Sequence, residues 1–147
     1  MMKVITASIL NIKQLIPLFD SYRVFYGQTS NPEAAYNFLK ERLTNHDSVI
    51  LLCLDDSEKG IGFTQLYPSF SSVSMQRTYI LNDLFVAPEV RKKGVGEALM
   101  EHAKQFAIKS GSKGLTLETA IDNPAQKLYI KLGWKKDVQV NHYTWEV

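Results

Sequence analysis

The sequence predicts a mixed α/β fold, and the alternation of two hydrophobic patterns carries that prediction. Apolar residues recur at helical spacing over residues 11–26 and 95–108. Between these two stretches, residues 49–54, 61–67 and 77–86 form apolar runs of strand length. Because helical and strand patterns alternate along the chain, a sheet covered by helices is expected.

The first part of the chain predicts one strand and two helices. Residues 4–7 form a short apolar run, and a helix over 11–26 is expected to be kinked or split at Pro17, which lacks a backbone donor. Asn31-Pro32 combines an N-cap residue with proline at the first helical position, which predicts the start of a second helix. The predicted inner face of that helix carries Tyr36, Leu39 and Leu43.

The rest of the chain predicts strands alternating with helices, separated by Pro68, a Ser-rich loop over 69–74 and glycines. In chain order we expect strands over 49–54, 61–67 and 77–86, a helix over 95–108, a strand over 115–120, a helix over 123–132 and one or two final strands.

The composition fits a single domain spanning residues 1–147. No apolar run approaches the roughly 20 residues that a membrane span needs, and no signal-peptide core is evident at the N-terminus. The single cysteine, Cys53, excludes an internal disulfide and a Cys-based zinc site, and no His, Asp or Glu pair has metal-ligand spacing. We therefore expect a cytoplasmic protein with no metal and no membrane contact.

The charge balance argues against a nucleic-acid partner. Seventeen basic residues nearly balance fifteen acidic ones, for a net charge of +2, whereas nucleic-acid-binding domains are clearly basic. This leaves either solvated surface or a local site for one polyanionic ligand as the role of the clustered basic residues. They are Arg91, Lys92, Lys93, Lys127, Lys131, Lys135 and Lys136.

The densest chemical signal lies in residues 83–96, DLFVAPEVRKKGVG. An apolar strand ends at Val86, and a helix opens near Gly96. Gly94 and Gly96 permit a sharp turn and leave the backbone amides uncovered. Amides at a helix N-terminus suit a pyrophosphate, and the adjacent Arg91-Lys92-Lys93 adds positive charge.

Two common phosphate-binding motifs do not fit this loop. A Rossmann fingerprint needs a third glycine where Leu99 stands, and a Walker A loop needs Gly-Lys-Ser/Thr, which is absent. A plain glycine turn with a charged rim remains the structural alternative.

Two segments together resemble the GNAT superfamily of N-acetyltransferases. Residues 84–96 resemble its motif A, Arg/Gln-x-x-Gly-x-Gly/Ala after a strand. Residues 115–119, followed by Asn123, Ala125, Tyr129 and Gly133-Trp134, resemble its motif B. The second match is one residue out of step, because Gln126 holds the usual alanine position and Trp replaces Phe.

The resemblance implies the GNAT fold, a mixed central sheet with a splayed parallel strand pair flanked by helices. The strands ending at Val86 and Ala120 would form that pair, with pantetheine pairing along the splayed edge. Acetyl-CoA is the implied co-substrate. The residues implied to contact it are Leu84, Phe85, Val86, Arg91, Lys92, Lys93, Gly94, Val95, Gly96, Asn123, Ala125 and Tyr129.

The resemblance also assigns catalytic roles. Tyr129 matches the family's general acid, a phenol near the thioester sulfur, although core packing is the ordinary role of such a tyrosine. Asp83 or Glu118 could act as the base, directly or through water; a structural or solvent-facing carboxylate is the alternative for each. The oxyanion is expected to meet a backbone N–H near Val86.

The acceptor is expected between the first two helices and the later strands. Candidates are Tyr22, Arg23 and Tyr26, with Tyr36, Tyr67 and Phe70 as further aromatic residues that could instead simply cover the sheet. The expected activity is acetylation of a primary amine of a small molecule. Alternatives are a protein lysine acetyltransferase and a non-catalytic acyl-CoA-binding sensor. A homodimer is also expected.

Overall fold

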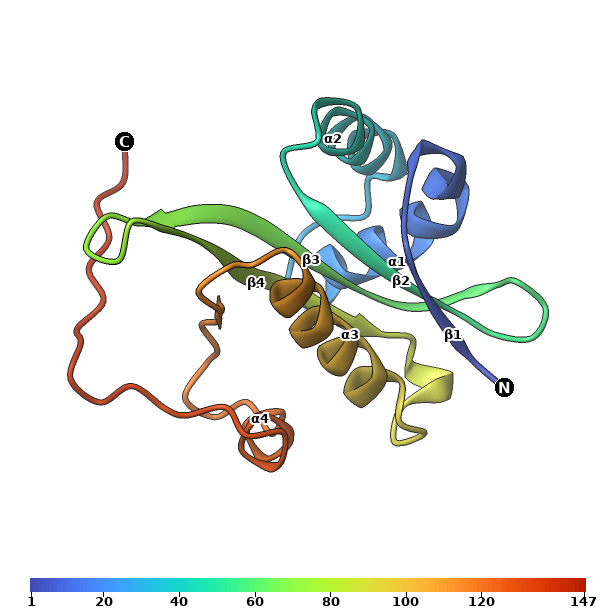
Figure 1. Cartoon of the computed structure of the whole chain (residues 1–147). Coiled ribbons are helices and arrows are strands. Elements are labelled where there is room, and N and C mark those ends of the chain that lie inside the picture. The colour runs from blue at the N-terminus through green and yellow to red at the C-terminus, as the bar shows by residue number, and fades with distance from the viewer.

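A computed structural model describes residues 1–147 and forms one five-stranded sheet with helices on both faces (Figure 1). The strands are β1 (Lys3–Thr6), β2 (Val49–Leu54), β3 (Gly60–Ser71), β4 (Gln76–Val86) and β5 (Leu115–Thr116). The helices are α1 (Ile12–Phe25), α2 (Pro32–Asn45), α3 (Val95–Lys109) and α4 (Gln126–Lys131), with short 3-10 turns η1 (Ile9–Asn11) and η2 (Pro88–Val90). None of these helices combines the length and apolar character that crossing a membrane requires.

The strands lie in chain order, and only the β4–β5 pair is parallel. This confirms the predicted mixed sheet. Alternate residues of β2 face opposite layers: Ile50 and Leu52 join a core with α1 and α2, whereas Leu51 and Cys53 join a core with α3. The sheet is therefore covered on both faces, which explains why β2 is continuously apolar.

The two N-terminal helices follow their capping signals, with two differences from the prediction. The Asn31 side chain accepts a hydrogen bond from the Ala34 amide at 3.0 Å, as an N-cap should. Helix α1 continues through Pro17, so of the predicted kink or split the split is wrong; burial of neighbouring residues such as Leu15 offsets the lost backbone bond. The inner face of α2 carries Leu39 and Leu43 as predicted, but Ala35 is buried there in place of Tyr36, which is exposed.

The β3–β4 hairpin is longer than predicted. Strand β3 runs through Pro68 to Ser71, so half of the expected Ser-rich loop is paired strand. Phe70 pairs with Arg77 across the hairpin, and the Arg77 guanidinium lies 4.5 Å from the Phe70 ring centre. This cross-strand contact supports pairing where the sequence alone indicated a loop.

The C-terminal part contains fewer elements than predicted. Strand β5 has two residues where six were expected, and α4 begins at Gln126, after the expected start at 123. Residues 135–147 form no strand, so the predicted final strands are wrong for this chain on its own. Figure 1 shows this segment running free of the sheet and helices, where no neighbouring strand offers hydrogen bonds.

Candidate active site

A bulge in β4 opens the sheet next to β5. In the β3–β4 ladder Gln65 faces Asp83 and Leu66 faces Leu81, so that Asn82 has no partner. Such an extra residue bends a strand and increases its twist. Strands β4 and β5 pair only as far as Ile80 and Thr116, and the outer edge of residues 81–86 is left without a neighbouring strand.

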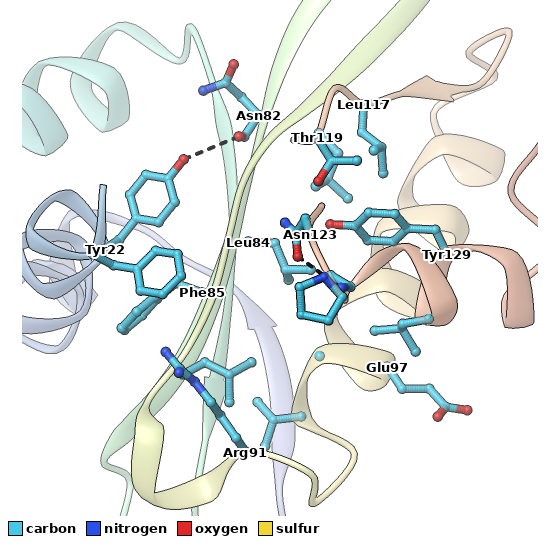
Figure 2. A pocket seen from close by; sticks show the side chains of 18 of the residues that line it. Tyr22, Asn82, Leu84, Phe85, Arg91, Glu97, Leu117, Thr119, Asn123 and Tyr129 are labelled. Carbon is cyan, nitrogen blue, oxygen red and sulfur yellow. Dashed lines mark hydrogen bonds between the residues drawn. The ribbon is translucent and has the colours of Figure 1, made fainter. Parts of the chain in front are cut away.

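A cavity of about 590 Å³ fills the opening between β4, α3 and the segment from β5 to α4 (Figure 2). It contains eleven of the twelve residues predicted to contact the cofactor, all except Lys93. The polypeptide thus brings together two sequence segments, around Gly94 and around Tyr129, that are more than thirty residues apart.

Unpaired amides gather at one end of this cavity. Gly94 caps α3 with a φ of 84°, a left-handed conformation that glycine adopts without strain. The backbone amides of residues 92–97 donate no hydrogen bond within the protein. Because these donors sit at the positive end of the α3 dipole, the loop fits a phosphate group.

The absence of a side chain at Gly96 keeps this end of the cavity open. A Cβ atom at Gly96 would lie 3.6 Å from the Leu128 side chain and 3.8 Å from that of Val86, between the two walls. A side chain longer than a methyl group would therefore have to displace one of these two walls. The residues present therefore fit the diphosphate and pantetheine arm of coenzyme A.

The three basic residues of the loop have different positions. Arg91 Nε donates to the Val86 carbonyl at 3.1 Å, and its guanidinium lies 5.7 Å from the ring centres of Phe25 and Phe85. Lys92 lines the cavity. The Lys93 ammonium instead donates to the Glu89 carbonyl at 3.3 Å and lies outside the cavity.

Tyr129 projects its hydroxyl into the cavity from α4 (Figure 2). Burial raises the pKa of its phenol, and the neighbouring Thr119 hydroxyl opposes that rise. The phenol is thus held in its protonated form at neutral pH, which a proton donor requires. Asn123 lies beside it, with its side-chain oxygen accepting the Ala125 amide at 2.9 Å and fixing the turn that leads into α4.

Asp83 lies on the other side of β4 from this cavity. Its side chain is only 3% exposed, and its two carboxylate oxygens accept hydrogen bonds from the side-chain amides of Gln65 and Asn82. It lines a second cavity of about 400 Å³ between the sheet, α1 and α2, together with Arg23 and Tyr67. Both amide donors are neutral, so no positive group is paired with this carboxylate.

The negative charge of Asp83 contributes to raised pKa values at two tyrosines. Burial, followed by the negative charge of Asp83, raises the pKa of Tyr67 to about 12. The same two causes, in the same order, raise the pKa of Tyr22 well above its usual range. The Tyr22 hydroxyl lies 3.5 Å from the Asn82 carbonyl at the bulge, and these two residues border both cavities.

The other predicted site residues are more scattered. Glu118 lines the first cavity but is exposed, with one carboxylate oxygen 3.2 Å from His142 Nδ1. Tyr26 also lines the first cavity. Tyr36 and Phe70 line neither cavity, so they belong to the surface.

Several residues that line the two cavities were not predicted from the sequence. Leu117 and Thr119 lie on either side of Glu118 in the segment after β5, and all three residues line the first cavity. Asn82 enters both cavities because of the bulge, and Gln65 supports Asp83 from the next strand. No local pattern could have found these two, because both depend on the register between β3 and β4.

Comparison with known proteins agrees with this geometry. Residues 15–134 match the acetyltransferase (GNAT) family. The chain belongs to the GNAT family of acetyltransferases. It is 52% identical over 130 residues to an uncharacterized N-acetyltransferase, YhfO, of Bacillus subtilis, covering 88% of this chain and 87% of that protein.

Solved structures of GNAT proteins have the same fold. A probable acetyltransferase superposes with a TM-score of 0.94 at 41% identity, covering 99% of this chain and 97% of that one. The aminoglycoside acetyltransferase AAC(6')-Iy, solved with a CoA-containing bisubstrate analogue, superposes with a TM-score of 0.80 at 18% identity, covering 100% and 99%. At that identity the second match bears on the fold alone.

Membership in the GNAT family makes this protein an acyltransferase, an N-acetyltransferase whose family uses acetyl-CoA as co-substrate. The predicted family and fold are thereby confirmed. The five-stranded mixed sheet with its parallel β4–β5 pair is the feature of the fold that opens the first cavity.

Proposed function

We propose that this GNAT protein transfers the acetyl group of acetyl-CoA to the primary amine of a small molecule, as one domain spanning residues 1–147. The observation that carries the proposal is the meeting of two cavities at the β4 bulge. One cavity holds free amides and a phenol, and the other holds a buried carboxylate without a cationic partner. A donor and a cationic acceptor could therefore approach one another at Tyr22 and Asn82.

On this proposal the first cavity holds the cofactor. The amides of residues 92–97 and the Lys92 ammonium would bind the diphosphate, while the free edge of Leu84–Val86 would pair with the pantetheine arm. Gly96 and Ala125 leave room for it, and Asn123 shapes the turn beside it. Acetyl-CoA supplies a thioester, whose acetyl group passes to the amine while CoA leaves as a thiol.

Tyr129 is the proposed general acid. Its hydroxyl points into the cavity, and its raised pKa keeps the proton on the phenol until it is needed by the departing sulfur. An N–H of the free edge near Val86 would donate to the carbonyl oxygen as negative charge develops. These two groups act on opposite ends of the bond that breaks.

The carboxylates of Asp83 and Glu118 would have different roles in acceptor binding and proton removal. Asp83 would attract the ammonium of the acceptor into the second cavity, since no protein cation is paired with it and the Arg23 guanidinium in that cavity lies 3.8 Å from Asp20. Glu118 lines the first cavity and faces solvent, so it would take the amine proton and pass it to water. Tyr22 and Arg23 would contact the body of the acceptor in the second cavity, and Tyr26 would contact it from the first cavity.

The size of the second cavity favours a small acceptor over the lysine of a folded protein. The second cavity, between α1, α2 and the sheet, has a volume of about 400 Å³, which lies within the range of small-molecule sites. A non-catalytic acyl-CoA sensor is the remaining alternative. The placement of Tyr129 and Asp83 favours turnover, because Tyr129 presents a proton donor to the first cavity and Asp83 lies in the second cavity, outside the cofactor site.

The decisive experiment measures CoA release from acetyl-CoA against a panel of small amines, amino acids, aminoglycosides and lysine peptides. We expect at least one small amine to raise release well above hydrolysis, and lysine peptides to be poorer acceptors. If no acceptor raises release while acetyl-CoA still raises the melting temperature, the sensor reading replaces this proposal.

A further inference from the structure

The second cavity holds one charged residue of each sign. Of its nine lining residues, Asp83 on β4 and Arg23 on α1 are charged, and the other seven are uncharged. In the proposed function Asp83 attracts the ammonium of the acceptor, whereas the charge of Arg23 has no role. A positive charge in the same cavity weakens the attraction of Asp83 for a ligand that carries an ammonium alone. A simple amine therefore makes poor use of this pair of charges.

The Arg23 guanidinium is only partly satisfied by the protein. Its Nη1 donates to the Thr29 carbonyl at 3.3 Å and lies 3.8 Å from Asp20 Oδ1. Its Nε and Nη2 donate no hydrogen bond to another protein group. Because a guanidinium carries five N–H donors in a planar fork, most of its donors are available to a ligand in the cavity.

Asp20 is a weak competitor for this guanidinium. Its Oδ2 accepts the Ser30 hydroxyl at 2.6 Å, and its Oδ1 accepts the Asn31 amide at 2.7 Å. The 3.8 Å separation from Arg23 is longer than a hydrogen bond, and Asp20 does not line the cavity. The Asp20 carboxylate therefore fixes the loop before α2, and Arg23 can still bind a second anion.

The rest of the second cavity is mostly apolar. The rings of Phe19 and Phe38 stack with their centres 5.5 Å apart and their planes at 8°, so they form a flat wall. Ala34 and Ala35 of α2 line the cavity with methyl groups only. These small residues leave room beside the rings for the carbon skeleton of a ligand.

We propose that the acceptor is an amino acid, in the broad sense of an amine that also carries a carboxylate. This inference rests on the proposed function of the second cavity. Asp83 would bind the ammonium, Arg23 the carboxylate, and the aromatic wall the apolar part of the molecule. Pairing of a guanidinium fork with a carboxylate gives both a strong hydrogen bond and a fixed orientation.

The carboxylate takes no part in the chemical step. The amine nitrogen bonds to the acetyl carbon and the carbon–sulfur bond breaks. Glu118 passes the protons lost by the amine to water, and the sulfur takes one proton from Tyr129, so that CoA leaves as the thiol. The role of Arg23 is therefore to bind and orient the acceptor.

A polyamine and an amino phosphate fit these charges less well. A second ammonium in the cavity would meet the positive charge of Arg23. A phosphate monoester carries about 1.5 to 2 negative charges at neutral pH, whereas Arg23 offers one positive charge and lies 3.8 Å from Asp20. The single charge of a carboxylate is the better match.

The test compares each amino acid with the amine that remains when its carboxylate is removed. Phenylalanine with phenethylamine and leucine with isopentylamine represent α-amino acids, and 4-aminobutyrate with propylamine represents a wider spacing of the charges. CoA release at saturating acetyl-CoA gives kcat and KM for each compound. For at least one spacing we expect KM of the acid to be roughly 10- to 100-fold lower, the usual effect of a charged hydrogen bond.

Arg23→Gln separates an anion contact from a structural role. We expect it to raise KM for the preferred acid by roughly 10- to 100-fold, to the level of the matching amine, and to leave KM for that amine within about twofold of wild type. Arg77→Gln is the matched control, because it removes an arginine that lines neither cavity and should change neither value.

The outcomes separate this inference from the proposed function. Amines that are acetylated as well as the matching acids overturn the inference and leave an amine acetyltransferase. An Arg23→Gln variant that raises KM for acid and amine alike also overturns it, since Arg23 would then be structural. If no compound raises CoA release above hydrolysis, the proposed function fails, and the inference with it. If Arg23→Gln loses its circular dichroism signal, Arg23→Lys replaces it, and the wild-type pairs still decide.

Discussion

Gln65 and Asp83 face one another across β3 and β4, and the Gln65 amide donates a hydrogen bond to the Asp83 carboxylate. The second carboxylate oxygen accepts from Asn82 at 2.8 Å. Both donors are uncharged, so they hold the carboxylate in place without cancelling its charge. The consequence is a negative site, 3% exposed, that faces the cavity between α1 and α2.

Replacing Asp83 by Asn tests that charge while nearly preserving the shape of the side chain. A charged hydrogen bond contributes about 1.5–3 kcal/mol, so we expect KM for the amine to rise by roughly 10- to 100-fold. The affinity for acetyl-CoA, measured by calorimetry, should stay within about twofold.

Glu118→Gln is the companion variant, because Glu118 is the carboxylate of the other cavity. On the proposed division of roles it lowers kcat more than it raises KM. If Asp83→Asn instead lowers kcat with KM unchanged, Asp83 is the base and Glu118 is not needed for proton transfer.

Gly94 and Gly27 offer a matched pair for the phosphate loop. Both glycines have a left-handed backbone conformation, with φ of 84° and 83°. Alanine should therefore cost about 1–2 kcal/mol of unfolding free energy at either position. Only Gly94 lies in the cofactor cavity. We expect both variants to lower the melting temperature, and only Gly94→Ala to weaken acetyl-CoA binding in a titration. Equal cofactor affinities would show that the loop amides do not hold the ligand.

The elements that could be predicted are those fixed by neighbouring residues in the sequence. The capping of α2 by Asn31 and the glycine start of α3 are local, and both appear where expected. The lengths of β3 and β5 depend on what lies across from them, and the sequence could not show that β5 ends at Thr116.

The lining of the first cavity was predicted more completely than that of the second cavity for the same reason. Its glycine loop and its tyrosine are short motifs, whereas the second cavity exists because Asn82 bulges and Gln65 reaches Asp83 from another strand. Lys93 is the one predicted cofactor residue that does not line the first cavity, since its side chain turns back to the Glu89 carbonyl.

Tyr129→Phe tests the proposed acid. Removing only the hydroxyl should lower kcat by about 10²- to 10⁴-fold, the usual contribution of general acid–base catalysis. Because the ring and its contact with Trp134 remain, the affinity for acetyl-CoA should hardly change. Comparable losses of kcat and affinity would assign Tyr129 to packing instead.

The pH dependence of kcat in the wild-type enzyme is a second test of Tyr129 as the general acid. Burial raises the pKa of its phenol above the ordinary value of 10.0, so the proton remains in place throughout the neutral and mildly alkaline range. We expect kcat to show no alkaline fall between pH 8 and about 10. A fall with a midpoint below pH 10 would mean that a group other than Tyr129 donates the proton.

The final prediction concerns stability at high pH and Tyr67. Its pKa is about 12 in the folded protein, raised first by burial and then by the charge of Asp83, against an ordinary value of 10.0. The unfolded chain therefore loses this proton first. The stabilising contribution is fully present below pH 10 and is lost as the pH rises through about 12.

Tyr67→Phe removes this titration. The difference in melting temperature between wild type and variant should be constant from pH 7 to 9, then shift in favour of the variant as the pH rises from 10 to 11.5. Tyr143→Phe serves as the control, because Tyr143 is 86% exposed and lies outside both cavities. If both variants gain equally on wild type at high pH, Tyr67 is not buried beside a negative charge, and the second cavity cannot have the polarity that attracts an amine.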